Sequence, residues 1–186
     1  MWPFTKSSRP RTETRSVLEA FDNIHYYAAV GGFTTSWAGL EMSLDYANTI
    51  IMAFAKGHEI QDDLPISLKP KITFFRKAHS RLADISTFKD EGLALASRVT
   101  ALVAIRHDMI HGIHGLASGI LPDGARQFYR LTYKGAGFTT TNKPYSAAAI
   151  LEAGVTAGRL RDSIVAHATS IASLLAPEDQ RHNFLG

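Results

Sequence analysis

The sequence predicts an all-α fold, a bundle of about five helices with one small β-hairpin inserted before the last helix. Two observations support this prediction. Long stretches repeat apolar residues with the period of an α-helix, and glycine or proline follows their ends. The stretch 121–145 instead combines turn signals with aromatic and β-branched residues. With 186 residues and no cysteine, the chain is long enough to form a single-domain core without disulfides.

Residues 1–15 are expected to form a flexible basic tail, and residues 16–186 a single helical domain. The tail contains two prolines and four basic side chains, against the single acidic side chain of Glu13. This composition is typical of mobile termini. Because the tail carries the whole formal net charge of +3, the domain itself is neutral. Any contact with nucleic acid must therefore come from local basic patches.

The first two helices are expected at 16–30 and 33–56, separated by the glycine pair at 31–32. The apolar run 47–55 is too short to span a bilayer, and the N-terminus has no apolar secretion signal. We therefore expect a cytoplasmic protein without membrane contact. The apolar residues of the second helix follow the helical period and are expected in the core: Trp37, Leu40, Leu44, Ala47, Ile51 and Phe54.

Two more helices, expected at 70–85 and 88–112, follow a loop that contains two prolines. The start of the first is rich in basic residues without an intervening acid. Such a run is usually a solvated face, but it can also form a track of contacts to RNA phosphates. The residues assigned to that track are Lys71, Lys77 and Arg81.

A β-hairpin is expected from the runs "QFYRLTY" (127–133) and "FTTT" (138–141), with turn signals at 123–124 and 135–137. Its aromatic side chains can in principle stack on bases. We expect them to pack within the protein instead, as aromatic residues of hairpins usually do; they are Phe128, Tyr129 and Tyr133.

The last helix is expected at 147–176, with Ser146 as its N-terminal cap and Pro177 at its end. It is rich in alanine and glycine. Small side chains allow two helix backbones to come close together, so we expect this helix to pack closely against another.

The helix expected at 88–112 ends in a polar cluster, "RHDMIHGIHG" (106–115). Arg106 interrupts an apolar stripe on this helix. A buried charge is costly unless it is paired. Glu41 interrupts a similar stripe on the helix expected at 33–56, so we expect Glu41 to lie near Arg106 and to orient it.

His111 and Arg106 together suit one kind of chemistry. A histidine can accept or donate a proton near neutral pH. An arginine can hold a phosphate and stabilise charge that develops on it. The pair therefore suits RNA cleavage in which the 2′-hydroxyl attacks the neighbouring phosphate, a reaction that needs no metal.

At these residues the sequence resembles the HEPN-domain family. "RHDMIHG" is similar to its R-x4-6-H motif, with four residues between Arg106 and His111, and His107 stands where the family often has asparagine. The layout is similar over 16–176. The resemblance implies a homodimer in which two motifs form one cleft, and a metal-independent endoribonuclease without a cofactor. Such proteins act in toxin–antitoxin, phage-defence or RNA-processing systems.

In the scheme that this resemblance implies, His111 is the general acid and base, and Arg106 stabilises the phosphate in the transition state. His107 and Asp108 give polar support, and Glu41 orients Arg106. The partners implied are RNA, a second copy of the chain and an antitoxin protein.

Two alternative interpretations remain open. Many HEPN-like domains are inactive, which leaves a non-catalytic dimer that binds RNA or protein. His107, His111 and His114 are spaced to share one helical face and form a site for zinc, nickel or copper. However, Gly112 is expected to end the helix before His114. The remaining histidines are expected at the surface or hydrogen-bonded in the core: His25, His58, His79, His167 and His182.

Overall fold

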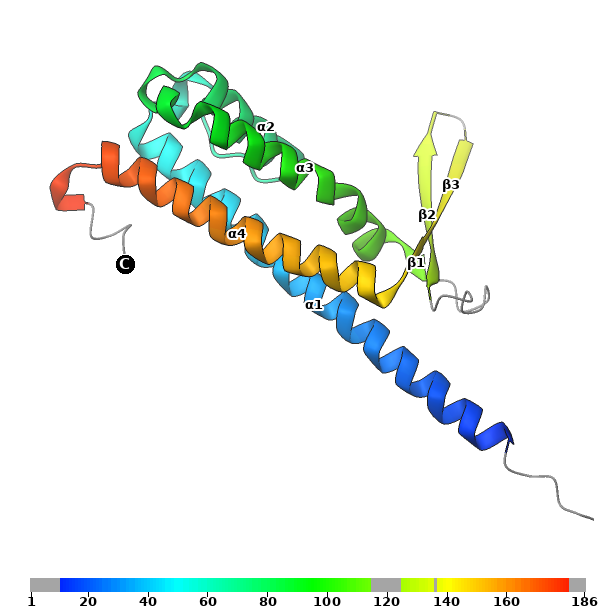
Figure 1. Cartoon of the computed structure of the whole chain (residues 1–186). Helices are drawn as coiled ribbons and strands as arrows, with labels where there is room; N and C mark the ends of the chain where they lie inside the picture. Colours follow the sequence, from blue (N-terminus) through cyan, green and yellow to red (C-terminus); the bar gives the residue numbers. More distant parts are fainter. Residues whose placement is uncertain (1–10, 115–124, 136, 181–186) are drawn as a thin grey trace, which may run out of the picture.

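The computed structural model describes residues 11–114, 125–135 and 137–180, with the backbone alone described for 11–22, 113–114 and 134. It is mostly helical, with a hairpin between the last two long helices, which confirms the predicted fold class (Figure 1). The elements in chain order are α1 (Arg11–Phe54), η1 (Gly57–Glu59), α2 (Leu68–Arg81), η2 (Ala83–Phe88), α3 (Lys89–His111), β1 (Ile113–His114), β2 (Arg126–Lys134), β3 (Gly137–Tyr145) and α4 (Ala147–Leu175).

The first two predicted helices are one continuous helix, α1, of 44 residues. The predicted break at Gly31 and Gly32 is therefore wrong. Each glycine lowers helix stability by about 1 kcal/mol, but the buried side chains of Ala29 and Phe33 continue the same packed stripe on either side of the pair. Residues 11–15 of the expected tail also belong to α1, and residues 1–10 lie outside the described residues.

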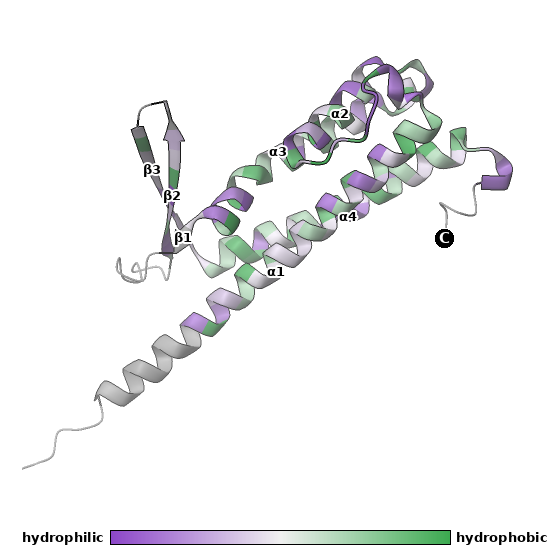
Figure 2. Ribbon diagram, turned by 180° about the vertical axis from the view of Figure 1, so that it is seen from behind, coloured by the Kyte–Doolittle hydropathy of each residue, from purple (hydrophilic) through white to green (hydrophobic). Residues whose placement is uncertain are grey.

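Helices α1 and α4 run parallel and lie side by side (Figure 1). Gly154 of α4 packs against the backbone of Phe33, where an added Cβ would lie only 3.2 Å from the Phe33 Cα atom. Gly39 of α1 lies beside the side chain of Arg161 of α4. The expected close approach of the last helix is thus confirmed. Hydrophobic residues recur at intervals along both helices (Figure 2).

The helices α2 and α3 form an antiparallel pair that packs beside α1 and α4 (Figure 1). α2 ends earlier than expected, because Leu82 is extended and η2 follows it. The core confirms the apolar stripe expected at 33–56, in which Trp37, Leu40, Leu44, Ala47 and Ile51 are buried. Phe54, the last residue of that stripe, is only half-buried against the core. None of the helices in the described ranges combines the length and apolarity needed to span a bilayer.

The predicted hairpin is present, as β2 and β3, with its turn at Gly135. A short strand that we did not predict, β1, follows α3 directly and pairs with β2. Two residues are too few to show a periodic pattern. Phe128 is buried, as expected for packing, whereas Tyr133 is exposed beside Phe138. The turn signal at 123–124 lies outside the described residues.

The predicted ends of the last helix are confirmed. The Ser146 side chain accepts a hydrogen bond from the Ala149 N–H at 3.1 Å, which is the geometry of an N-terminal cap. At the other end, α4 stops one residue before Ala176, which is extended and precedes Pro177.

Two of the isolated histidines form a hydrogen-bonded chain in the core. The Nδ1 atom of His79 lies 2.8 Å from the Phe75 carbonyl oxygen, and its Nε2 atom lies 2.8 Å from Nε2 of His167. His167 reaches Glu91 through Nδ1 at 2.9 Å. His79 must donate to the carbonyl, so its Nε2 accepts from His167. His25 and His58 are exposed, and His182 lies outside the described residues.

Burial lowers the pKa of His79 from 6.5 to about 4. The unfolded chain therefore binds more protons between these values, and stability falls as the pH is lowered from about 6.5 towards 4. We expect the free energy of unfolding, measured by urea titration, to decrease by up to about 3 kcal/mol over this range. In the His79→Phe variant, the free energy of unfolding should depend less on pH than in the unchanged protein. Equal pH dependence in the two proteins would contradict this assignment.

Candidate functional site

The polar cluster begins in the last two turns of α3, which ends at His111 as predicted. Gly112 turns the chain into an extended conformation, and its N–H donates to the Asp108 carbonyl at 2.9 Å. A Cβ at this position would lie 2.2 Å from that carbonyl oxygen. Only glycine fits there without a shift of the backbone, so Gly112 fixes where the helix ends and leaves the His111 side chain exposed.

Arg106 and His111 are in direct contact. Nη1 of Arg106 lies 3.1 Å from Nε2 of His111. Arginine can only donate, so His111 accepts with Nε2 and carries its proton on Nδ1. This tautomer is the neutral imidazole. The Nε atom of Arg106 is buried and has no hydrogen-bond partner in the described part of the chain. The motif spacing in the sequence thus identified two side chains that are in contact in the structure.

His107 lies beside this pair. Its ring centre is 5.8 Å from that of His111, with the rings nearly perpendicular. Partial burial, followed by the positive charges of Arg106 and Arg130, lowers the pKa of His107. His107 is therefore neutral at pH 7. It can accept a proton or a hydrogen bond, but it is a poor source of protons.

Asp108 is buried and anchors the hairpin. It is 4% exposed and accepts a hydrogen bond from the Tyr145 hydroxyl at 2.7 Å. Two cations also lie near it, Arg130 at 3.5 Å and Lys143 at 3.8 Å. Burial and the bond to Asp108 raise the pKa of Tyr145. The described side-chain contacts of Asp108 are thus with the hairpin, and its expected polar support of the motif stays a prediction.

Arg130 and Tyr145 are the residues of this site that sequence reasoning missed. Arg126, Phe128 and Arg130 alternate along β2, so they share one face of the strand. Phe128 is buried, and Arg126 is buried next to the Tyr26 ring at 4.4 Å. The alternation of arginine with a buried aromatic residue was the signal available in the sequence.

Glu41 does not pair with Arg106, so that expectation is wrong. Its carboxylate accepts a hydrogen bond from Trp37 Nε1 at 3.2 Å and lies 3.6 Å from Lys71 Nζ. The physical reason is that α2 places Lys71 directly against α1. Lys71 neutralises Glu41 there, while Arg106 finds its partner on its own helix.

The basic residues of α2 divide into two groups. Lys71 is buried and paired with Asp45 at 2.8 Å as well as with Glu41, so its predicted contact with RNA phosphates is wrong. Lys77 and Arg81 are both exposed, four residues apart on the same face of α2. The expectation for these two remains a prediction.

The alternative metal site of His107, His111 and His114 lies partly outside the described side chains, because only the backbone of His114 is described. Among the residues whose side chains are described, no group of three or more acidic, histidine or cysteine residues is arranged to hold a metal ion.

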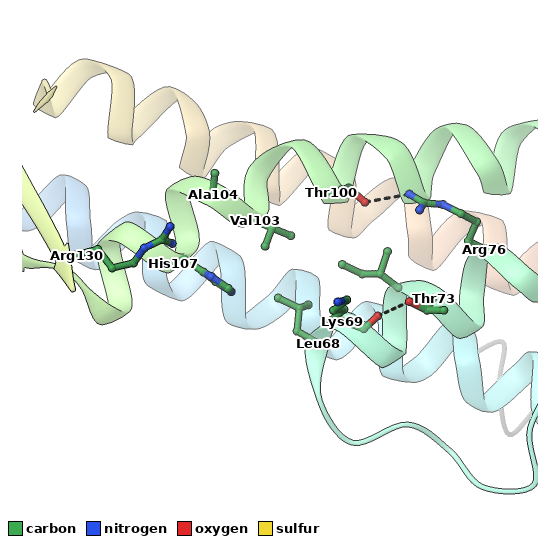
Figure 3. A pocket seen from close by; sticks show the side chains of 10 residues that line it. Leu68, Lys69, Thr73, Arg76, Thr100, Val103, Ala104, His107 and Arg130 are labelled. Atoms are coloured by element: carbon green, nitrogen blue, oxygen red, sulfur yellow. Dashed lines mark hydrogen bonds between the residues drawn. The ribbon is translucent and has the colours of Figure 1, made fainter. Parts of the chain in front are cut away.

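A pocket of about 540 Å³ lies between α2 and α3, next to this cluster (Figure 3). We call it the α2–α3 pocket. Arg130 and His107 lie at one end, and Arg76 with Thr100 at the other. Leu68 and Val103 lie between them; the remaining lining residues are Lys69, Ile72, Thr73 and Ala104.

No protein-family model, curated protein or solved structure matches this chain.

Proposed function

We propose that the protein is a metal-independent endoribonuclease of the HEPN type. The observation that carries this proposal is the contact of 3.1 Å between Arg106 and the Nε2 atom of His111, at the exposed end of α3. A group that binds phosphate and a neutral histidine that can accept a proton are thus within reach of one substrate phosphate.

In the proposed reaction, the substrate phosphate takes the place of His111 as the partner of Arg106. The freed Nε2 atom of His111 then accepts the proton of the RNA 2′-hydroxyl. The 2′-oxygen attacks the adjacent phosphorus, and Arg106 stabilises the charge that develops on the phosphate. The bond to the 5′-oxygen breaks and that oxygen takes up a proton. The products are a 2′,3′-cyclic phosphate and a 5′-hydroxyl.

The proton for the leaving oxygen is proposed to come from a second copy of the chain. His107 is neutral and cannot supply it readily, since its pKa is lowered. In a homodimer that joins two α3 ends, one His111 serves as the base, and the other, released from its own Arg106 and protonated by solvent, serves as the acid. Ile110 is 40% exposed on the same turn and would be covered in such a dimer.

Lys77 and Arg81 are proposed to guide the RNA backbone along α2, because both are exposed and no acidic residue lies between them. A toxin or defence protein of the cytoplasm, held inactive by an antitoxin protein, is the biological role that this chemistry fits.

One observation favours a second candidate function, a non-catalytic dimer that binds RNA or protein. Arg106 and His111 already form a hydrogen bond with each other without any substrate. In that case the bond only stabilises the end of α3, and the protein binds RNA or a partner without cleaving either.

The proposal is tested by incubating the purified full-length protein with single-stranded RNA in EDTA. We expect cleavage that leaves 2′,3′-cyclic phosphate and 5′-hydroxyl ends, detected by enzymatic end analysis. RNA with 2′-O-methyl riboses should remain intact, since the attacking hydroxyl is blocked. Cleavage that requires a divalent metal, or that leaves 5′-phosphate ends, would rule out this mechanism, and binding without cleavage would support the second candidate.

A further inference from the structure

The α2–α3 pocket has no role in the chemistry described above. We propose that it binds one nucleotide, with the base against its apolar centre and phosphates on its cationic ends. The inference rests on the proposed function only in placing this nucleotide next to the one that is cleaved. The shared chemistry is a base attached to phosphate, which either a free nucleotide or an RNA strand supplies.

The centre of the pocket suits a base. Leu68 and Ile72 of α2 face Val103 of α3 across it, so apolar side chains approach from two helices. The volume of about 540 Å³ falls within the range of small-molecule sites. Ala104, an exposed residue at its wall, leaves space that a larger side chain would fill.

The charges of the pocket select an anion. Its lining includes Lys69, Arg76 and Arg130, and none of the described residues that line it is acidic. Lys69 has no ion-pair partner among the described residues. Arg76 donates to the Thr100 hydroxyl at 3.1 Å rather than to a carboxylate. Arg130 reaches Asp108 with one nitrogen, while its Nε atom is buried without a hydrogen-bond partner in the described part of the chain.

The positions of these cations favour a nucleotide over a fatty acid. Arg130 lies at one end and Arg76 at the other, with the apolar side chains between them (Figure 3). An RNA strand carries a phosphate on each side of every base, which matches positive charge at both ends. A fatty acid has a single charged end. The hydroxyls of Thr73 and Thr100 add polar groups that can bond to a base edge.

The pocket also continues into the catalytic cluster. His107 is part of its lining, and the ring centres of His107 and His111 are 5.8 Å apart. A nucleotide held there would therefore lie next to the phosphate that reaches Arg106. The pocket would thus hold an RNA strand in position for cleavage through contacts of protein side chains alone.

The test measures binding without cleavage, by calorimetry on the full-length protein. The probes are the four nucleoside 5′-monophosphates and a single-stranded RNA hexamer with 2′-O-methyl riboses. Lys69→Ala removes a cation, and Ala104→Phe fills the pocket from an exposed position. We expect each change to weaken binding by about tenfold or more. Lys89→Ala, an exposed lysine at the start of α3 that does not line the pocket, is the matched control and should bind like the unchanged protein.

Binding of the monophosphates, lost in both pocket variants, supports a free nucleotide as occupant; binding of the hexamer alone, lost in the same variants, supports an RNA strand. Decanoate, a fatty acid with a single charged end, is the comparison ligand. The inference is overturned if neither probe binds, if both variants bind normally, or if decanoate binds and nucleotides do not. A protein that binds nucleotides here but cleaves no RNA would overturn the proposed function and leave the pocket assignment intact. RNA cleavage by a protein that binds neither the monophosphates nor the hexamer at this pocket would overturn the pocket assignment and leave the proposed function intact.

Discussion

Replacing His111 with alanine is expected to slow RNA cleavage by about 100- to 10,000-fold, because the variant loses the group that accepts the 2′-hydroxyl proton. Arg106→Ala should lose about 100- to 1000-fold in kcat, since its charge acts mainly on the transition state. Initial rates on a fluorescent RNA substrate measure both effects. Neither residue belongs to the buried hydrophobic core, because Arg106 is half-buried and His111 is exposed.

The matched controls come from the same chain. Arg98 is an exposed arginine on α3, and His58 is an exposed histidine in η1. Arg98→Ala and His58→Ala should cleave RNA at the rate of the unchanged protein. Thermal melting of all four variants checks that they are folded. If folded His111→Ala keeps its activity, His111 is not the base.

Asp108→Ala is expected to lower the free energy of unfolding by about 3 kcal/mol. The substitution removes a carboxylate that is 4% exposed, and it leaves the Tyr145 hydroxyl and the Arg130 guanidinium without their acceptor. For a chain of this length such a loss lowers the Tm by about 6–12 °C. Because Asp108 joins α3 to the hairpin, we also expect weaker near-UV circular dichroism from Tyr145.

Two further variants separate this effect from a general loss of charge. Asp162 is an exposed acid whose ion pair with Arg161 is on the surface, so Asp162→Ala should change stability by less than about 1 kcal/mol. Asp108→Asn keeps an acceptor for the Tyr145 hydroxyl and should be destabilised less than Asp108→Ala. Equal stability of Asp108→Ala and Asp162→Ala would show that the hairpin is not anchored through Asp108.

Features that depend on neighbouring residues could be predicted from the sequence. The cap at Ser146, the end of α3 at Gly112 and the hairpin each follow from local backbone preferences. The contact between Arg106 and His111 belongs to the same class, since the two residues are only five positions apart on one helix.

Features that depend on which helices become neighbours could not be predicted. The glycine pair in α1 indicated a break, but packing against α4 keeps the helix continuous. The apolar stripes that contain Glu41 and Arg106 showed which face of each helix is buried. They did not show which other helix packs against that face. Lys71 of α2 pairs with Glu41 of α1, and Arg130 of β2 lies near His107. Both arrangements arise from tertiary structure.

The central claim is that Arg106 and His111 act as one catalytic unit, and a double-mutant cycle tests it most directly. The measured quantity is kcat/KM for RNA cleavage in EDTA by the unchanged protein, Arg106→Ala, His111→Ala and the double variant. We predict that the double variant is within about tenfold of the slower single variant, because either change already disables the unit. A loss equal to the product of the two single losses would contradict the claim.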